Sequence, residues 1–284
     1  MKRYQQRNNI DFWIAQALDE IKTLYGDECR VQDRSIRKFG TMGDGRSFGT
    51  TKATIAEFQG SEISETYATA NTIDSLIGDS DDDIGKLMRV EGHTLDGSEN
   101  MTFLSQPVTH GGTTRVPLTT STFRATRLFV DGLGTIASPT TPVVGNTYIY
   151  DSSAAGGVTD GAPNTPAATK VMVAAGKTQS QKCATSISSS QYWILTASKL
   201  GIDKATGTNV SVFGDVEYRQ IGGVFRPFGF NFDLSRDGLN FDVEDGKPYR
   251  IVPKNSDVEM KATSSAGSTL GYAWMLGVLA IIDS

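Results

Sequence analysis

The sequence has few of the residues that special chemistry requires. Only two of its 284 residues are cysteines, Cys29 and Cys183, and only two are histidines. Two distant cysteines do not make a disulfide framework, and no Cys-x-x-Cys pair suggests a zinc site. We therefore expect two reduced thiols in a protein made in a cytoplasm. The polar N-terminus lacks the apolar segment of a signal peptide, so we expect none.

Long apolar runs and clustered basic residues are also scarce. The longest apolar stretch, Ala273 to Ile282, is about half as long as a membrane helix must be, so it predicts a buried strand. The net charge is −5, and basic residues gather only near the N-terminus, at Lys2, Arg3 and Arg7. Phosphate binding needs clustered Lys and Arg. We therefore expect neither a nucleic-acid partner nor a membrane partner.

An acidic run resembles a calcium loop without completing it. Asp79, Asp81 and Asp83 have the alternating spacing of the first calcium ligands in an EF-hand. Ile84 replaces the Gly that the loop needs for its turn, and Val90 replaces its final Glu. We therefore expect a solvated acidic linker and no metal.

Catalytic motifs are missing as well. His93 and His110 each lie between a Gly and a Thr, as exposed loop imidazoles would, and two such ligands are too few for a metal site. Carboxylate pairs occur, such as Asp215 with Glu217, but sequence spacing cannot place two acids for glycoside hydrolysis. The sequence predicts no enzyme, no catalytic residue and no cofactor.

The strongest helix pattern lies near the N-terminus, in "NNIDFWIAQALDEIKTLYGDE". Asn9 can cap this helix and Gly26 can end it. Its apolar residues recur at spacings of four and three, which gives the helix an apolar stripe. The polar, Gly-rich stretch from Arg30 to Gly60 reads as an arm or loops, so we expect the stripe to reach another subunit; packing on its own domain is the alternative. The subunit-contact candidates are Ile10, Trp13, Ile14, Ala17, Ile21 and Leu24.

After residue 86 the pattern becomes short strands separated by turn signals such as Asp96-Gly97 and Asp131-Gly132. Frequent short strands predict a mainly-β fold, an antiparallel, jelly-roll-like β-sandwich. We predict an anchoring region of helix plus extended arm at 1–85 and a sandwich domain at 86–284. Within this scheme, residues 68–77 could form a short helix and 152–169 a long exposed loop.

Three strands carry specific expectations. In "SDVEMKATSS" the charged residues Asp257, Glu259 and Lys261 alternate with apolar ones, which predicts a half-exposed strand. The last strand, 270–282, is apolar on both faces and should lie centrally in the fold or against another subunit. The aromatic-face candidates Phe228, Phe230 and Phe232 should line one face of a strand, either in the sandwich core or as a sugar-binding or subunit-contact face.

The C-terminal part of the chain resembles structural proteins of tailed-bacteriophage virions. The resemblance lies in a strand that ends in Ile251-Val252-Pro253, then Asn255-Ser256-Asp257, the alternating charged strand, a Gly/Ser turn and a final apolar strand with internal Gly277. "VFRPFGF", and "VEGHTLDGSENMTFLSQPVT" with the following "TRVPLTTSTFRATRLF", are similar in kind. The likeness covers residues 86–284 and implies a β-sandwich of the virion.

The resemblance also implies a function. It favours a non-enzymatic capsid decoration, or cement, protein, made in the host cytoplasm and located in the virion, that clamps the head shell through its N-terminal region. Its partners would be the major capsid protein or other virion proteins. It would form a homo-oligomer, with a trimer favoured because a trimer suits a three-fold site on a shell. The alternatives are a neck, tail or fibre component, or a glycan-binding or glycan-degrading module on the virion.

Overall fold

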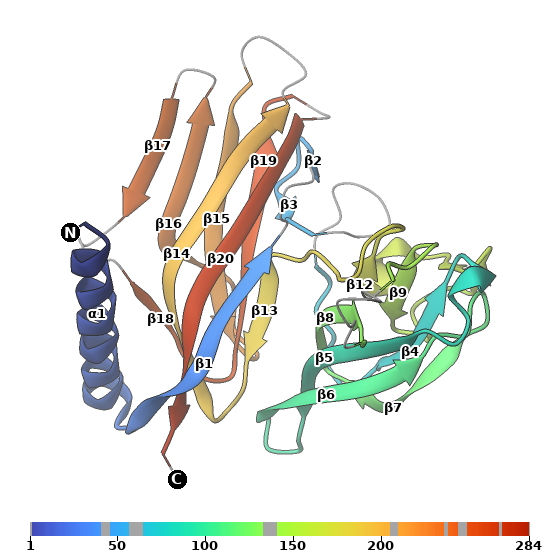
Figure 1. Ribbon diagram of the computed structural model, residues 1–284, viewed down its shortest axis with the longest axis horizontal. Helices are drawn as coiled ribbons and strands as arrows, with labels where there is room; N and C mark the ends of the chain where they lie inside the picture. The colour runs from blue at the N-terminus through green and yellow to red at the C-terminus, as the bar shows by residue number, and fades with distance from the viewer. Residues whose placement is uncertain are drawn as a thin grey trace.

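The computed structural model describes residues 2–40, 46–56, 65–132, 141–204, 210–235, 238–243, 249–266 and 269–283. Of these, 2–10, 32–40, 46–48, 203–204, 229–235 and 238–243 are described by their backbone alone. Over this part of the chain the protein is mainly β, with one α-helix and antiparallel sheets, as the sequence predicted. Figure 1 shows two lobes side by side, a large one with both termini and a smaller one built from the middle of the chain.

The large lobe is a sandwich of two sheets, named A and B. Sheet A has the order β1 (Cys29–Gly40), β20 (Thr269–Ile282), β14 (Gln191–Lys204), β18 (Arg250–Val252), and β2 (Arg46–Phe48) also pairs with β20. Sheet B has the order β13 (Ala184–Ile187), β19 (Ser256–Ser264), β15 (Val212–Gln220), β16 (Arg226–Ser235), β17 (Gly238–Val243), and β3 (Ala53–Thr54) also pairs with β19. The core between the sheets includes Trp193, Leu195, Val216, Met260 and Met275.

Sheet A is apolar on both faces because both are covered. In β14, Trp193 and Leu195 point into the sandwich core, while the alternate residues Tyr192 and Ile194 belong to a second cluster on the outer face. Helix α1 (Lys2–Tyr25) covers that outer face. Strand β20 lies in the middle of the sheet, between β14 on one side and β1 and β2 on the other. The expectation of a central, apolar last strand is therefore confirmed.

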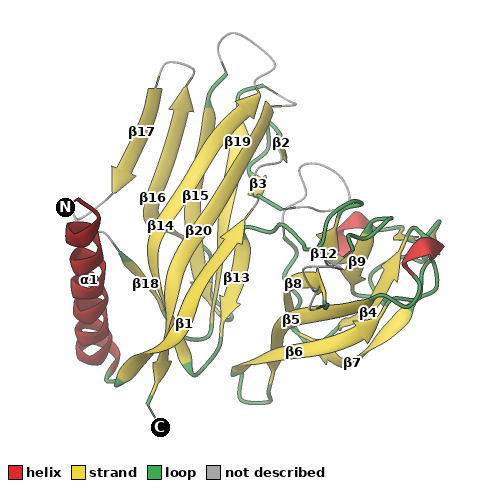
Figure 2. Ribbon diagram, in the orientation of Figure 1, coloured by secondary structure: helices red, strands yellow, loops and turns green. Residues whose placement is uncertain are grey.

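The helix packs on its own chain, and this corrects the expectation that its stripe reaches another subunit. Ala17 and Ile21 are fully buried in the cluster with Tyr192 and Ile194, and Trp13 and Ile14 pack against it. A second subunit cannot contact side chains that sheet A already covers. Leu24 is exposed, and the side chain of Ile10 lies outside the described residues. Figure 2 shows this helix beside β18 on the large lobe.

The helix ends as predicted but starts earlier. Gly26 adopts a φ of 73° and its N–H donates to the Lys22 carbonyl, which stops the helix after Tyr25. The first helical residue is Lys2, before the predicted cap Asn9. This helix is not apolar enough to cross a membrane, and the rest of the described chain holds no other candidate span.

The predicted arm is part of the sandwich. Strand β1 pairs with β20 from Cys29–Ile282 to Gly40–Trp274, β2 pairs with β20, and β3 pairs with β19. The reason is hydrogen bonding, because a long central strand such as β20 needs partners along both edges. The alternation of polar residues in β1 obscured its strand character in the sequence.

The small lobe is built from the described residues 69–132 and 141–180. Its sheets have the orders β12-β9-β4-β7 and β6-β5-β8. The strands are β4 (Ile73–Gly78), β5 (Leu87–Leu95), β6 (Met101–Thr109), β7 (Val116–Thr122), β8 (Arg124–Val130), β9 (Thr147–Tyr150) and β12 (Thr169–Val173), with a hairpin of β10 (Val158–Thr159) and β11 (Ala162–Pro163). Their core includes Leu76, Met88, Leu128 and Ile149.

These pairings correct three expectations. A boundary between residues 85 and 86 would cut the small lobe, because β4 pairs with β7 and β9. The predicted short helix at 68–77 gives way to strand β4. The predicted loop at 152–169 contains the β10–β11 hairpin and a 3-10 turn, η2 (Pro166–Ala168), and it buries Ala155 and Ala168.

Candidate functional site at the boundary between the lobes

The charged strand β19 is not half-exposed as predicted. It lies between β13 and β15 in sheet B, and Asp257 and Glu259 are only 0% and 1% exposed. Val258 and Met260 point into the sandwich core, so the predicted alternation holds. The opposite, charged face meets the small lobe and the segment 65–68 that leads into it. Covering this face buries the acids, which must then find partners.

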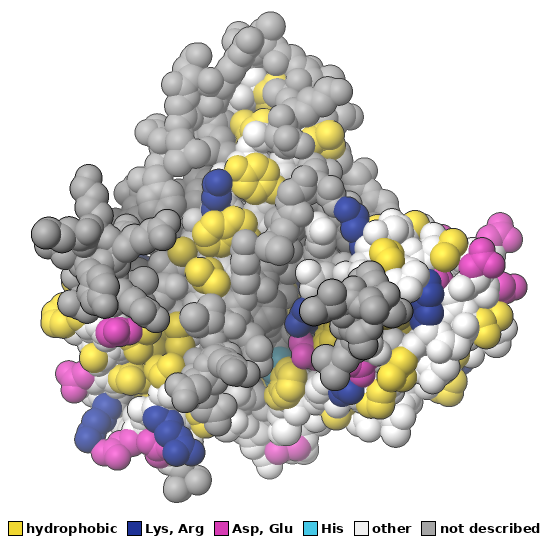
Figure 3. Space-filling model, in the orientation of Figure 1, with side chains coloured by type: hydrophobic (Ala, Val, Ile, Leu, Met, Phe, Trp, Pro, Cys, Tyr) yellow, Lys and Arg dark blue, Asp and Glu magenta, His cyan; other side chains and the backbone are white. Residues whose placement is uncertain are grey.

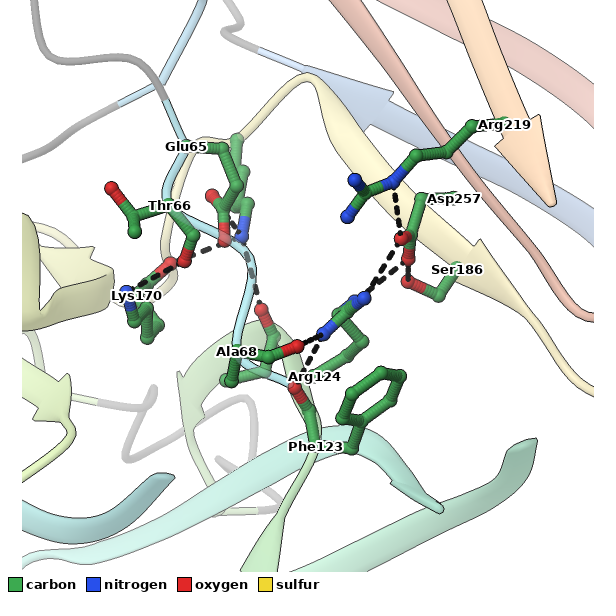
Figure 4. A network of polar contacts seen from close by, with 11 residues as sticks. Glu65, Thr66, Ala68, Phe123, Arg124, Lys170, Ser186, Arg219 and Asp257 are labelled. Atoms are coloured by element: carbon green, nitrogen blue, oxygen red, sulfur yellow. Dashed lines mark hydrogen bonds and ion pairs between the residues drawn. The ribbon is translucent and has the colours of Figure 1, made fainter. Parts of the chain in front are cut away.

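Asp257 is bound by an arginine from the other lobe. Arg124 of β8 donates from Nε and Nη2 to the two oxygens of Asp257, at 2.8 and 2.9 Å (Figure 4). Its Nη1 donates to the carbonyls of Ala68 and Phe123, at 2.7 and 3.0 Å. This two-pronged contact is the strong, planar form of a charge-assisted hydrogen bond.

Two groups of the large lobe complete the shell of Asp257. Ser186 Oγ donates to it at 2.7 Å, and Arg219 Nε donates at 3.2 Å. Burial by itself would raise the pKa of Asp257, but the hydrogen bonds and charge of Arg124, with Ser186 and Arg219, hold that pKa below its ordinary value. The carboxylate is therefore charged and fully engaged.

Aromatic rings cover the two guanidinium groups. Arg219 lies over the rings of Tyr67 and Phe225, at 4.3 and 4.6 Å from their centroids, and Arg124 lies over Phe123 at 3.6 Å. Tyr67 and Phe225 also contact each other. Such rings exclude water and attract the cations. Burial raises the pKa of Tyr67 well above its ordinary value, so its hydroxyl stays protonated.

A second charged group lies farther along the same face. Glu259 accepts from Thr54 Oγ1 at 2.6 Å and pairs with Lys261 at 2.9 Å, and Lys261 also pairs with Glu217 at 3.1 Å. Lys52 bridges Glu217 and Asp215, at 2.5 and 2.7 Å. We call these residues the carboxylate–lysine group.

Two acids of this group have opposite pKa shifts. Burial raises the pKa of Glu259, whereas the hydrogen bonds and charges of Lys52 and Lys261 outweigh burial and lower that of Glu217. The two residues lie directly opposite each other on β19 and β15. Separated pKa values are typical of acid–base pairs in catalysis. The Glu259 side chain, however, is covered, and both carboxylates are held by lysines.

Two buried lysines tie segment 65–68 in place. Lys182 pairs with Glu65 at 2.6 Å and donates to the carbonyls of Ala125 and Lys170. Lys170 donates to the carbonyls of Thr66 and Ala167, at 2.6 and 2.8 Å, and its burial lowers its pKa. Lys182 has three acceptors and Lys170 has two, so both act as structural ties.

The histidines are buried, which corrects the prediction of exposed loop imidazoles. His93 is 3% exposed, its ring contacts Phe103 edge-on, and its Nδ1 has no hydrogen-bond partner in the described structure. Burial lowers its pKa to about 4. His110, inside the small lobe, contacts Thr147 Oγ1 at 3.0 Å and accepts from the Gly112 amide at 2.9 Å.

The acidic run is not a solvated linker either. Asp81 accepts from the amide and hydroxyl of Thr113, and Asp83 is buried, pairs with Lys86 and accepts from the amides of residues 144 and 145. Asp79 accepts from Asn146. Asp79 and Asp83 therefore fasten the loop at residues 144–146, and Asp81 fastens the loop at Thr113. In the described parts of the chain no three potential ligands are grouped to hold a metal ion.

The aromatic-face candidates do not form a described sugar platform. Phe228 is partly buried, packs against the sandwich core and contacts the Tyr218 ring at 4.6 Å. That position matches the core alternative. The side chains of Phe230 and Phe232 lie outside the described residues.

Comparison with family models, curated proteins and solved structures gave no match. The chemistry of the boundary residues is therefore the basis for a functional proposal. Arg124 and Asp257 pair across the two lobes, whereas the carboxylate–lysine group pairs within the large lobe.

Proposed function

We propose that the chain is a non-enzymatic structural protein of a tailed-phage virion, most simply a decoration protein bound to the outside of the head shell. The resemblance of residues 86–284 to virion proteins and the mainly-β sandwich support this proposal. The observation that supports this proposal most is the way in which the buried charged residues are paired. The buried acids and bases at the lobe boundary pair with each other, so they are engaged in contacts within the protein itself. A shell component needs such internal rigidity more than it needs free catalytic groups.

In this proposal the attachment surface is the exposed side of α1 with the start of β1. Phe12, Leu24 and Tyr25 of α1 and Val31 of β1 are 54%, 63%, 43% and 36% exposed. Figure 3 shows hydrophobic side chains gathered on this side of the large lobe, away from the small lobe. Exposed apolar side chains that lie together commonly mark protein contacts. The partner would be the major capsid protein, another virion protein or a further copy in a trimer.

Particle binding tests the proposal. Phe12→Ser with Leu24→Ser removes exposed apolar groups from α1. Ile84→Ser with Val144→Ser is the matched control, because those side chains are 62% and 52% exposed on the small lobe. We expect wild type and control to sediment with purified heads, with or without tails, and the α1 double variant to stay in the supernatant with an unchanged melting transition. Recovery of wild type only with tails would support the neck, tail or fibre alternative and overturn a head location.

The opposed carboxyls of Glu217 and Glu259 are the observation that favours the glycan-degrading alternative. If that alternative is right, the protein releases sugar from host envelope and Glu217→Gln abolishes the release. On the structural proposal no release occurs, and Glu217→Gln still binds heads.

A further inference from the structure

The boundary between the lobes contains a buried carboxylate that acid can neutralise and a buried histidine that acid can charge. We propose that the two lobes separate reversibly on acidification, while each lobe keeps its own folded core. The proposal does not depend on virion attachment, because it rests on the boundary residues alone.

The apolar cores belong to separate lobes. In the described part of the chain, each buried hydrophobic cluster lies within one lobe: one inside the sandwich around Trp193 and Met275, one under α1, and two in the small lobe around Leu128 and Tyr150. Apolar burial does not titrate and is the main stabilising term within each lobe. At the boundary, ion pairs and the rings of Tyr67, Phe123 and Phe225 take the place of a shared apolar core.

Asp257 is the charge on which the boundary depends. Arg124 faces it from β8 of the small lobe, and Arg219 of β15 and Ser186 of β13 face it from the large lobe. Tyr67 covers the arginines from the connecting segment, and on its own strand the nearest charges are Glu259 and Lys261. Protonation of Asp257 would leave two close arginines without their shared counter-charge. Because its pKa is depressed below the ordinary 3.8, its stabilisation is fully present above that value and is lost only as pH falls further, through the folded-state value. Opening between pH 7 and pH 4 is therefore driven by His93, and loss of the Asp257 charge adds to it at lower pH.

His93 responds in the same direction at higher pH. It lies on β5, opposite Arg124 of β8 and Phe103 of β6, and the charge of Asp257 acts on it across the boundary. Its ring is buried and neutral when the lobes are closed, with a pKa of about 4 against an ordinary 6.5. An opened boundary would solvate the ring, and the open state would then bind a proton that the closed state excludes. Between pH 6.5 and 4 this favours opening by up to roughly 300-fold.

The described crossing between the lobes, at residues 180–183, provides the hinge. Ser180 still pairs with Leu128 of the small lobe, whereas the Cys183 amide donates to Ile55 of the large lobe. Ala56 bridges to Lys182 beside this crossing. The chain therefore passes from one lobe to the other within about three residues, and these contacts keep the lobes joined when the face around Asp257 opens.

Hydrogen–deuterium exchange of the full chain between pH 7 and pH 4, corrected for intrinsic rates, tests the joint. The boundary reporters are the amides of Met101 and Ser189, which donate across the boundary to Asn255 Oδ1 and the Met101 carbonyl. We expect their protection to fall at least tenfold more than that of β14, β20, β4 and β9, and to return at pH 7.

Two matched histidine variants test whether His93 controls the pH at which the boundary opens. His93→Gln should shift the opening to lower pH, whereas His110→Gln, the same change inside the small lobe, should not. Boundary protection that persists to pH 4, or that is lost together with the cores, would overturn the proposal. So would equal shifts in the two variants. If His93→Gln does not fold, the wild-type profile alone decides between these outcomes.

Discussion

Arg124 and Asp257 are 6% and 0% exposed, so each ion has lost nearly all of its water. A buried pair of this kind adds little net stability, because desolvation offsets the attraction. Removing one partner is different, since the other charge is left buried and unpaired. The contact between the lobes therefore depends on the presence of both partners of this ion pair.

Arg124→Ala should therefore lower the free energy of unfolding by about 3–5 kcal/mol. Arg115→Ala is the control, because Arg115 and Asp74 form an ion pair that is 48% and 30% exposed, and such pairs contribute about 1 kcal/mol or less. Urea unfolding at pH 7 measures both. Equal losses of unfolding free energy in the two variants would mean that, without Arg124, Asp257 is hydrated or bound by another residue.

The cysteines differ in reactivity for the same reason, burial. Burial raises the pKa of the Cys183 thiol, which is fully covered, whereas Cys29 is only partly buried and its pKa is raised less. Since the thiolate is the reactive form, we expect one slow thiol in the native protein at pH 8 with Ellman's reagent. The second should react only after denaturation. Two thiols of equal native reactivity would contradict this placement of Cys183.

Among the elements, β20 was predictable and β1 was not. The apolar residues on both faces of 270–282 require a central position wherever the strand lies. The polar stretch 29–40 carries no such requirement, and its strand character comes from β20, whose free edge it pairs. The alternation of residues in β19 was predictable, because a period of two is a local pattern. The burial of Asp257 and Glu259 was not predictable, because residues more than a hundred positions away in the sequence help to cover them.

Gly277 in β20 lies in a tightly packed part of sheet A. A Cβ there would lie 2.4 Å from Trp193 Nε1 and 2.5 Å from the Ile194 carbonyl oxygen. Gly277→Ala should cost about 1–3 kcal/mol, because the neighbouring backbone cannot move away easily. Gly97→Ala is the control, since nothing lies within 4 Å of a Cβ at that position. Thermal unfolding compares them, and an unchanged midpoint for Gly277→Ala would show that sheet A adjusts.

At the scale of the whole molecule, the mainly-β sandwich was predictable from strand and turn signals, but the division into lobes was not. The first strands complete sheets made by the last ones, and the small lobe is inserted between them. The candidate site was missed for the same reason. Arg124 and Asp257 lie on different lobes, and the local signal that existed, an alternating acid strand inside a sandwich, does not say what covers it.

We expect that the sandwich does not fold without the N-terminal region, because β1 and β2 pair with β20 and β3 pairs with β19. A chain lacking residues 1–56 loses β1, β2 and β3, and leaves one edge of β20 unpaired. Exposed apolar edges promote aggregation. We expect this truncated chain to lose the cooperative melting transition and to precipitate, as circular dichroism and sedimentation can show. A soluble truncated chain with the wild-type transition would contradict the role of β1.

The central functional proposal is attachment to a virion as a structural protein. A three-dimensional reconstruction of the phage particle that carries this chain tests it most directly. The account predicts two-lobed density on the outer surface of the head, with the α1 side of the large lobe against the shell and the small lobe pointing away. Particles whose heads bear no such density, while the chain is recovered in the unassembled fraction, would contradict the proposal.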